Sequence, residues 1–172
     1  MMLKKLLFIL LITLSVPNLH AHVMVAQHAT LRFQAKGAYF LASYPISAFE
    51  GVDDNYDDLM DQKELKKHYP ALVQKIRNQV QLTEDGKVKE LEGLLINLSH
   101  SHTHQKAVSH LLVMGRFKPV GQGVVLFHSR LFGKAKHEHV FKIRITLQDQ
   151  PVDVVLTPQN THIEISKLNS RQ

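Results

Sequence analysis

The sequence predicts a mainly β protein, an antiparallel β-sandwich with one inserted helix at about residues 62–81. Two observations predict this fold class. Short runs of alternating apolar and polar residues recur along the chain and are separated by turn residues, as in antiparallel sheets. A single segment instead carries apolar residues three and four positions apart, which is the spacing of one helical face.

Strands are expected on both sides of that helix. Residues 29–46 predict a hairpin, because two strand-like runs flank the turn residues Lys36 and Gly37. Beyond Asp85 and Gly86, the turn-separated runs are those of an antiparallel sandwich. The further strands are predicted at residues 89–99, 107–117, 123–132, 137–147, 151–158 and 161–168.

The helix is predicted from an apolar stripe whose members are Leu65, Tyr69, Leu72, Val73, Ile76 and Val80. Pro70 lies within this stripe. Because proline lacks the N–H of the helical ladder and clashes with the preceding turn, Pro70 predicts a kink or the start of a second helix.

The N-terminal segment has the order of a secretory signal peptide, with two Lys, an apolar run and then small residues. The apolar run is shorter than the roughly twenty residues that cross a bilayer. We expect cleavage after Ala21, so that residues 1–21 are a signal peptide. Residues 22–172 would form a single β-rich domain with an insertion at residues 50–81. The expected location is the periplasm, with secretion from the cell as the lesser alternative.

Composition excludes several kinds of chemistry. The chain has no cysteine, which rules out disulfides, thiolate metal ligands and cysteine nucleophiles. Its net charge of +6 is spread without an Arg-rich or aromatic-interleaved stretch, so nucleic-acid binding is not expected. The sequence holds no G-x-S-x-G, no Gly-rich phosphate loop and no H-E-x-x-H. We therefore expect no enzymatic activity, and no membrane span after signal cleavage.

Residues 51–65 hold six acidic side chains and one Asn, in a chain that is basic overall. Ca²⁺ takes six to eight oxygen ligands, and alternate short side chains supply them when a loop curls round the ion. Counted as twelve positions from the first ligand, positions 1, 3, 5, 7, 9 and 12 are Asp53, Asn55, Asp57, Leu59, Asp61 and Glu64.

This ligand order resembles an EF-hand calcium loop. The resemblance implies a structural Ca²⁺ that fixes residues 53–64, with Glu64 giving two oxygens from the first turn of the exiting helix. It covers one loop and that helix, because no entering helix is predicted, and Asp58 replaces the Gly usual at position 6. The alternative is a helix cap without metal, in which Asp61 is the N-cap and Glu64 completes a capping box.

Clustered histidines offer an alternative metal site. Two histidines that are two residues apart on a strand share a face, and can then reach one Cu²⁺, Zn²⁺ or Ni²⁺. A histidine at a new N-terminus adds its α-amino group, an arrangement that resembles a copper histidine brace. The alternative ligands are His22, His28, His100, His102, His104, His137 and His139. Without a metal, residues 100–104 would be a polar loop and residues 137–139 a half-buried strand entrance.

From these patterns we expect an exported calcium-binding β-sandwich protein that acts as a binding or accessory module. The alternative is a periplasmic carrier of copper, zinc or nickel that uses the N-terminal and clustered histidines. The expected partner is a metal ion, and an envelope protein partner is left open.

Overall fold

The computed structural model describes residues 27–99 and 107–169. Ten strands in this part of the chain form two sheets. The six-stranded sheet contains β1 (Gln27–Gln34), β2 (Gly37–Pro45), β5 (Leu91–Leu98), β6 (His110–Phe117), β8 (Phe141–Leu147) and β9 (Gln150–Leu156). The four-stranded sheet contains β3 (Val80–Glu84), β4 (Lys87–Lys89), β7 (Val125–Ser129) and β10 (His162–Glu164).

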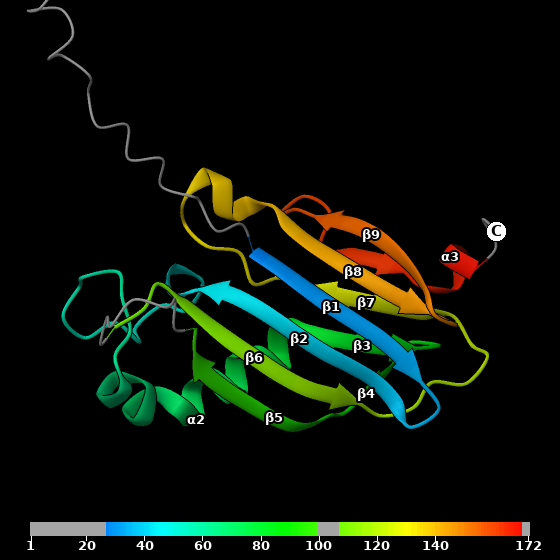
Figure 1. The fold of residues 1–172 in the computed structure, drawn as a ribbon, viewed down its shortest axis with the longest axis horizontal. Helices are drawn as coiled ribbons and strands as arrows, with labels where there is room; N and C mark the ends of the chain where they lie inside the picture. The colour runs from blue at the N-terminus through cyan, green and yellow to red at the C-terminus, as the bar shows by residue number, and fades with distance from the viewer. Residues whose placement is uncertain (1–26, 100–106, 170–172) are drawn as a thin grey trace, which may run out of the picture.

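The two sheets lie face to face, with the six-stranded sheet in front and β3, β4 and β7 behind it (Figure 1). Side chains from both sheets meet in one apolar core. Phe40 of β2 lies 5.9 Å from Phe117 of β6 and 5.8 Å from Phe127 of β7, measured between ring centroids. All three rings are buried, so the aromatic contact joins the layers as in a β-sandwich. The mainly β fold class predicted from the sequence is confirmed.

Strand order in the larger sheet is β5-β6-β2-β1-β8-β9. Its neighbours pair antiparallel, with one exception. β1 pairs parallel with β8, from Gln27 opposite Phe141 to Arg32 opposite Thr146. The strand next to the described N-terminus therefore lies inside the sheet, between two neighbours.

The helix α2 (Gln62–Gln79) lies beside the sandwich at its β5 edge (Figure 1). Its apolar stripe packs inward, because Leu65, Leu72 and Ile76 are buried. Pro70 lies inside this one helix, so the second helix that it suggested does not form. Shorter helical turns are η1 (Ile46–Ala48), η2 (Lys136–His139) and α3 (Ser166–Asn169).

Three local predictions are wrong. The strand predicted at residues 161–168 ends at Glu164, and Ser166–Asn169 form α3 instead. The stripe was extended to Val80, but this residue has extended dihedrals (φ −118°, ψ 109°) and begins β3. β3 then turns into β4 through Asp85 and Gly86, whose φ values of 48° and 75° suit a tight hairpin turn. Residues 137–139, expected as a strand entrance, lie in η2 instead.

In residues 27–99 and 107–169, no helix is long and apolar enough to cross a membrane.

Candidate functional site

The acidic loop between η1 and α2 is anchored in the core on both sides. Phe49 and Val52 are buried just before it, and Met60 is completely buried near its end. Met60 also exchanges two backbone hydrogen bonds with Val108, with N···O distances of 2.8 and 3.0 Å. The loop tip is thus exposed while its ends are held by apolar burial and by a short bridge to another segment.

Asp53 organises the first half of the loop through backbone hydrogen bonds. Its Oδ1 accepts the N–H groups of Tyr56 at 2.7 Å and of Asp57 at 3.3 Å, and its Oδ2 accepts that of Asp58 at 2.9 Å. Tyr56 and Asp58 have φ values of 60° and 58°, a left-handed conformation that is uncommon for non-glycine residues. The chain therefore curls round the Asp53 carboxylate, with Tyr56 and Asp58 in left-handed conformations.

Asn55 and Asp57 lie against each other in the same curl. The N–H of Asp57 lies 3.2 Å from Asn55 Oδ1 as well as 3.3 Å from Asp53 Oδ1. Asn55 Nδ2 donates to Asp57 Oδ2 at 3.0 Å, and the N–H of Leu59 donates to Asp57 Oδ1 at 2.9 Å. The oxygen-bearing side chains at positions 1, 3 and 5 are therefore gathered round one stretch of backbone.

Glu64 closes the loop. Its side chain is buried, and Oε1 accepts the N–H of Asp54 at 3.0 Å while Oε2 accepts the N–H of Asp61 at 3.0 Å. The first bond brings position 12 beside position 2, so the two ends of the loop meet. The second bond belongs to the capping box of α2, in which Asp61 Oδ1 accepts the N–H groups of Lys63 and Glu64 at 2.8 Å.

Asp54 ties the loop to the exposed side of α2. Its carboxylate forms an ion pair with Lys67 at 2.7 Å and contacts His68 Nε2 at 3.0 Å. Hydrogen bonds, first from Lys67 and then from His68, hold the pKa of Asp54 below its ordinary value. Asp54 occupies position 2, which is not a ligand position. Lys67 and His68 therefore contact a carboxylate that is not one of the predicted calcium ligands.

The structure thus brings Asp53, Asn55, Asp57 and Glu64 into one curled loop, with Asp61 as the helix cap. The capping alternative of the sequence is present in full. Within residues 27–99 and 107–169, no group of three or more His, Asp or Glu side chains has an arrangement that could hold a metal ion as it stands. A hollow of about 240 Å³ beside the loop is lined in part by Asp53, Tyr56, Asp58 and Lys134.

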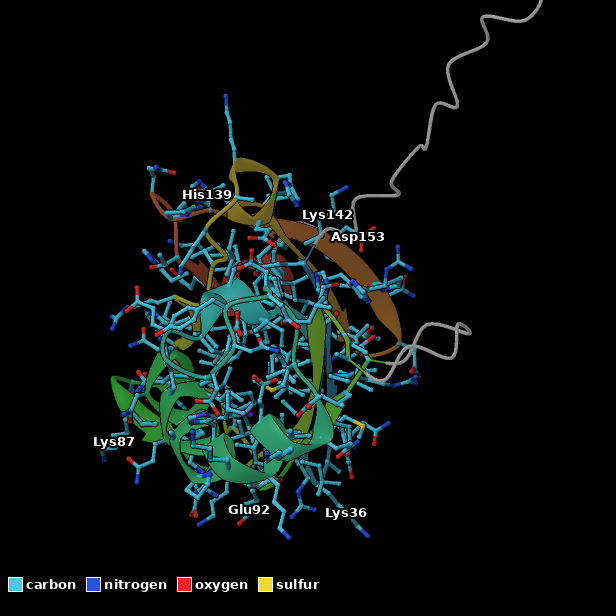
Figure 2. All side chains as sticks on the ribbon, turned by 90° about the vertical axis from the view of Figure 1, so that its left-hand side faces the viewer. Lys36, Lys87, Glu92, His139, Lys142 and Asp153 are labelled. Carbon is cyan, nitrogen blue, oxygen red and sulfur yellow. The ribbon has the colours of Figure 1, made fainter. Side chains whose placement is uncertain are left out.

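The predicted histidine ligands are not brought together in the part of the chain that the structure describes. His22, His100, His102 and His104 lie outside the described residues. His28 lies on the exposed face of β1, opposite Lys142 of β8. His139 lies at the same end of the molecule as Lys142, whereas Lys36 and Glu92 lie at the opposite end (Figure 2).

His137 and His139 do not share a strand face, because residues 136–139 form a 3₁₀ turn in which side chains two positions apart diverge by about 120°. Glu138 between them holds the turn. Its carboxylate accepts the hydroxyl of Ser47 at 2.7 Å and the N–H of Ala135 at 3.0 Å. The pair as predicted from strand geometry is therefore wrong.

One histidine pair was missed. His128 of β7 and His162 of β10 lie opposite each other with stacked rings. The sequence carried no signal for this pair, because the two residues are far apart in the chain and only the strand register brings them together.

Fold and loop together define a two-sheet, mainly β protein with an acidic loop that leads into a capped helix. No protein-family model matches the chain, and no curated protein matches it either.

Proposed function

We propose that this protein is an exported calcium-binding β-sandwich that acts as a binding or accessory module, with Ca²⁺ fixing residues 53–64. The observation that carries the proposal is the curl of the loop. Asp53 holds the backbone of residues 56–58, and Glu64 reaches back to Asp54. The last predicted ligand position therefore contacts the residue that follows the first one, which supports a loop closed at its two ends.

The donor set fits Ca²⁺. The side chains are carboxylates and one amide, which are the oxygen ligands that this hard cation prefers, and no sulfur or imidazole lies among positions 1, 3, 5, 9 and 12. Each carboxylate oxygen has two lone pairs, so Asp53 Oδ2 and the two oxygens of Glu64, which each accept one N–H, can also face a cation. In this proposal Asp53, Asp57 and Glu64 would supply the carboxylate oxygens that hold the ion.

Calcium would stabilise the fold by binding to the folded state alone. A single loop without an entering helix resembles extracellular modules, whose dissociation constants are on the order of 10⁻⁴ to 10⁻³ M. At 10 mM Ca²⁺ and a dissociation constant of about 10⁻³ M, the stabilisation is about 1.4 kcal/mol. For a domain of this size, that corresponds to a rise in Tm of about 3–5 °C.

The test is thermal unfolding of the mature protein in EDTA and then in 10 mM Ca²⁺ or Mg²⁺, with two matched variants. Asp57→Asn keeps an oxygen that can accept the Leu59 N–H but loses a charged ligand, so the Ca²⁺-dependent rise should disappear. Asp58→Asn makes the same charge change at position 6, where Asn tolerates the observed φ of 58°, so the rise should persist. Equal responses of the two variants would refute a specific site, as would an equal response to Mg²⁺.

The alternative function remains a carrier of copper, zinc or nickel. It rests on His22, His100, His102 and His104, on His28, and on His137 and His139 as separate ligands. The same unfolding experiment with Cu²⁺, Zn²⁺ or Ni²⁺ in place of Ca²⁺ separates the two functions. Export to the periplasm belongs to both proposals, and intact mass of the native protein tests the cleavage after Ala21.

A further inference from the structure

His128 and His162 form a cross-strand pair on the four-stranded sheet. Their ring centroids are 5.5 Å apart and the ring planes are inclined by 28°. His128 is half-buried and His162 is exposed, whereas Phe127 and Ser129, the neighbours of His128 along β7, are buried. Both imidazoles therefore lie on the face of the sheet that points away from the core.

The backbone register explains why the two rings are close. Ser129 donates its N–H to Thr161 at 2.9 Å, and Ile165 donates its N–H to Val125 at 2.7 Å. These are hydrogen-bonded positions of the antiparallel pair, so the alternate positions, which include His128 and His162, are non-hydrogen-bonded. Side chains directly opposite each other are closest at such positions. Both Cβ atoms are thus fixed by two strands rather than by a loop.

The surroundings favour the neutral imidazole, which is the form that binds metals. Burial first, then the neighbouring His162 and then Arg130, hold the pKa of His128 below its ordinary value. Gln81 of β3 lies opposite His128 on its other side. Glu164 lies two residues beyond His162 on the same face and forms an ion pair with Lys167 at 2.7 Å.

We propose that His128 and His162 together bind a divalent transition-metal ion such as Cu²⁺ or Zn²⁺ on the outer face of the four-stranded sheet. Imidazole nitrogen is a preferred ligand of both ions, at about 2.0–2.1 Å for Zn²⁺. Two imidazoles leave the remaining coordination positions to water or to a donor from another molecule. This site shares no residue with the calcium loop and does not depend on the calcium proposal.

The test follows each histidine separately. Protein with ¹³Cε1-labelled histidine is titrated with Zn²⁺ at pH 7.5, and the variants His128→Gln and His162→Gln assign the two resonances. Both resonances should shift along one saturation curve. In His162→Gln, the affinity sensed at His128 should fall by about tenfold or more, because one of two ligands is lost. His68→Gln, on α2 and in none of the proposed transition-metal ligand sets, is the control and should leave both shifts unchanged.

A gain of affinity provides a second measurement that does not depend on a damaged strand. Gln81→His places a third imidazole opposite His128, and it should tighten Zn²⁺ binding by about tenfold or more. Separate saturation curves for His128 and His162 would overturn the proposal. So would an unchanged His128 response in His162→Gln, or no gain in Gln81→His.

Discussion

Replacing Glu64 by Ala should destabilise the protein even without any metal. Glu64 is 7% exposed and accepts two backbone hydrogen bonds, from Asp54 and from Asp61, each at 3.0 Å. A hydrogen bond to a charged group contributes about 1.5–3 kcal/mol, and a buried donor left without an acceptor costs a similar amount. Taking the low end for two bonds, Glu64→Ala should lower the free energy of unfolding by about 3 kcal/mol.

Glu64→Gln should lie between Ala and the wild type. The amide keeps one oxygen, so one of the two N–H groups retains its acceptor and the other faces an NH₂ group. The expected loss is about 1.5 kcal/mol, half of the loss for Ala. In Tm, the Ala variant should fall by about 6–12 °C for a domain of this size.

The assay is urea unfolding in EDTA followed by far-UV circular dichroism, because the chain has no Trp to report fluorescence. Glu50→Ala, an exposed glutamate just before the loop, is the control and should change stability by less than about 0.5 kcal/mol. A loss below about 1 kcal/mol for Glu64→Ala, or a Gln variant as stable as the wild type, would refute the view that this carboxylate closes the loop.

Three further outcomes can be measured on other parts of the molecule. Gly37→Ala should cost about 2–3 kcal/mol in urea unfolding, because φ is 131° and a Cβ would lie 2.2 Å from a carbonyl of β6; a loss within error contradicts this. Tyr44→Phe should cost about 1–2 kcal/mol, since the Ser129 hydroxyl, 3.3 Å from the Tyr44 hydroxyl, loses a buried partner; adding Ser129→Ala should cost little more. The pKa of His128 is lowered in the folded protein, so the unfolded chain binds the proton more readily. Its contribution to stability is therefore complete above pH 6.5, the ordinary histidine pKa, and is lost as the pH falls through the lowered pKa. His162→Gln should raise that pKa in an NMR titration, and an unchanged value would rule out the coupling.

The sequence was most informative where a local residue pattern is enough to specify one strand or one helix. Alternation of apolar and polar residues in 141–147 predicted β8. The structure confirms the strand, and the inward side chains of Phe141, Ile143 and Ile145 are all buried. Helical spacing and the Asp61 and Glu64 caps predicted α2 and its start. The end of α2 was missed because Val80 continues the i+4 spacing from Ile76, while its backbone is already extended. Periodicity cannot distinguish a last helical residue from a first strand residue when both are buried.

The candidate sites show a similar division. The loop could be predicted because its residues are consecutive, so spacing alone places Asp53, Asn55 and Asp57 on one curl. The backbone bridge between Met60 and Val108 could not be predicted, because these residues are far apart in the sequence and only the fold brings them together. The histidine pair on β7 and β10 depends on strand register over a long sequence separation, and single-sequence patterns contain no information on register between distant strands.

The parallel pairing of β1 with β8 has a consequence for how the molecule assembles. Gln27 and Phe141 are register partners, so the first described strand finds one of its two neighbours more than a hundred residues later in the chain. Until that neighbour arrives, β1 is an open edge with unpaired N–H and C=O groups. Contacts of such long separation slow folding. The larger sheet is complete only when nearly all of the described chain is present. A fragment that ends before residue 141 should therefore leave the backbone N–H and C=O groups on one side of β1 unpaired, and it should aggregate through that edge.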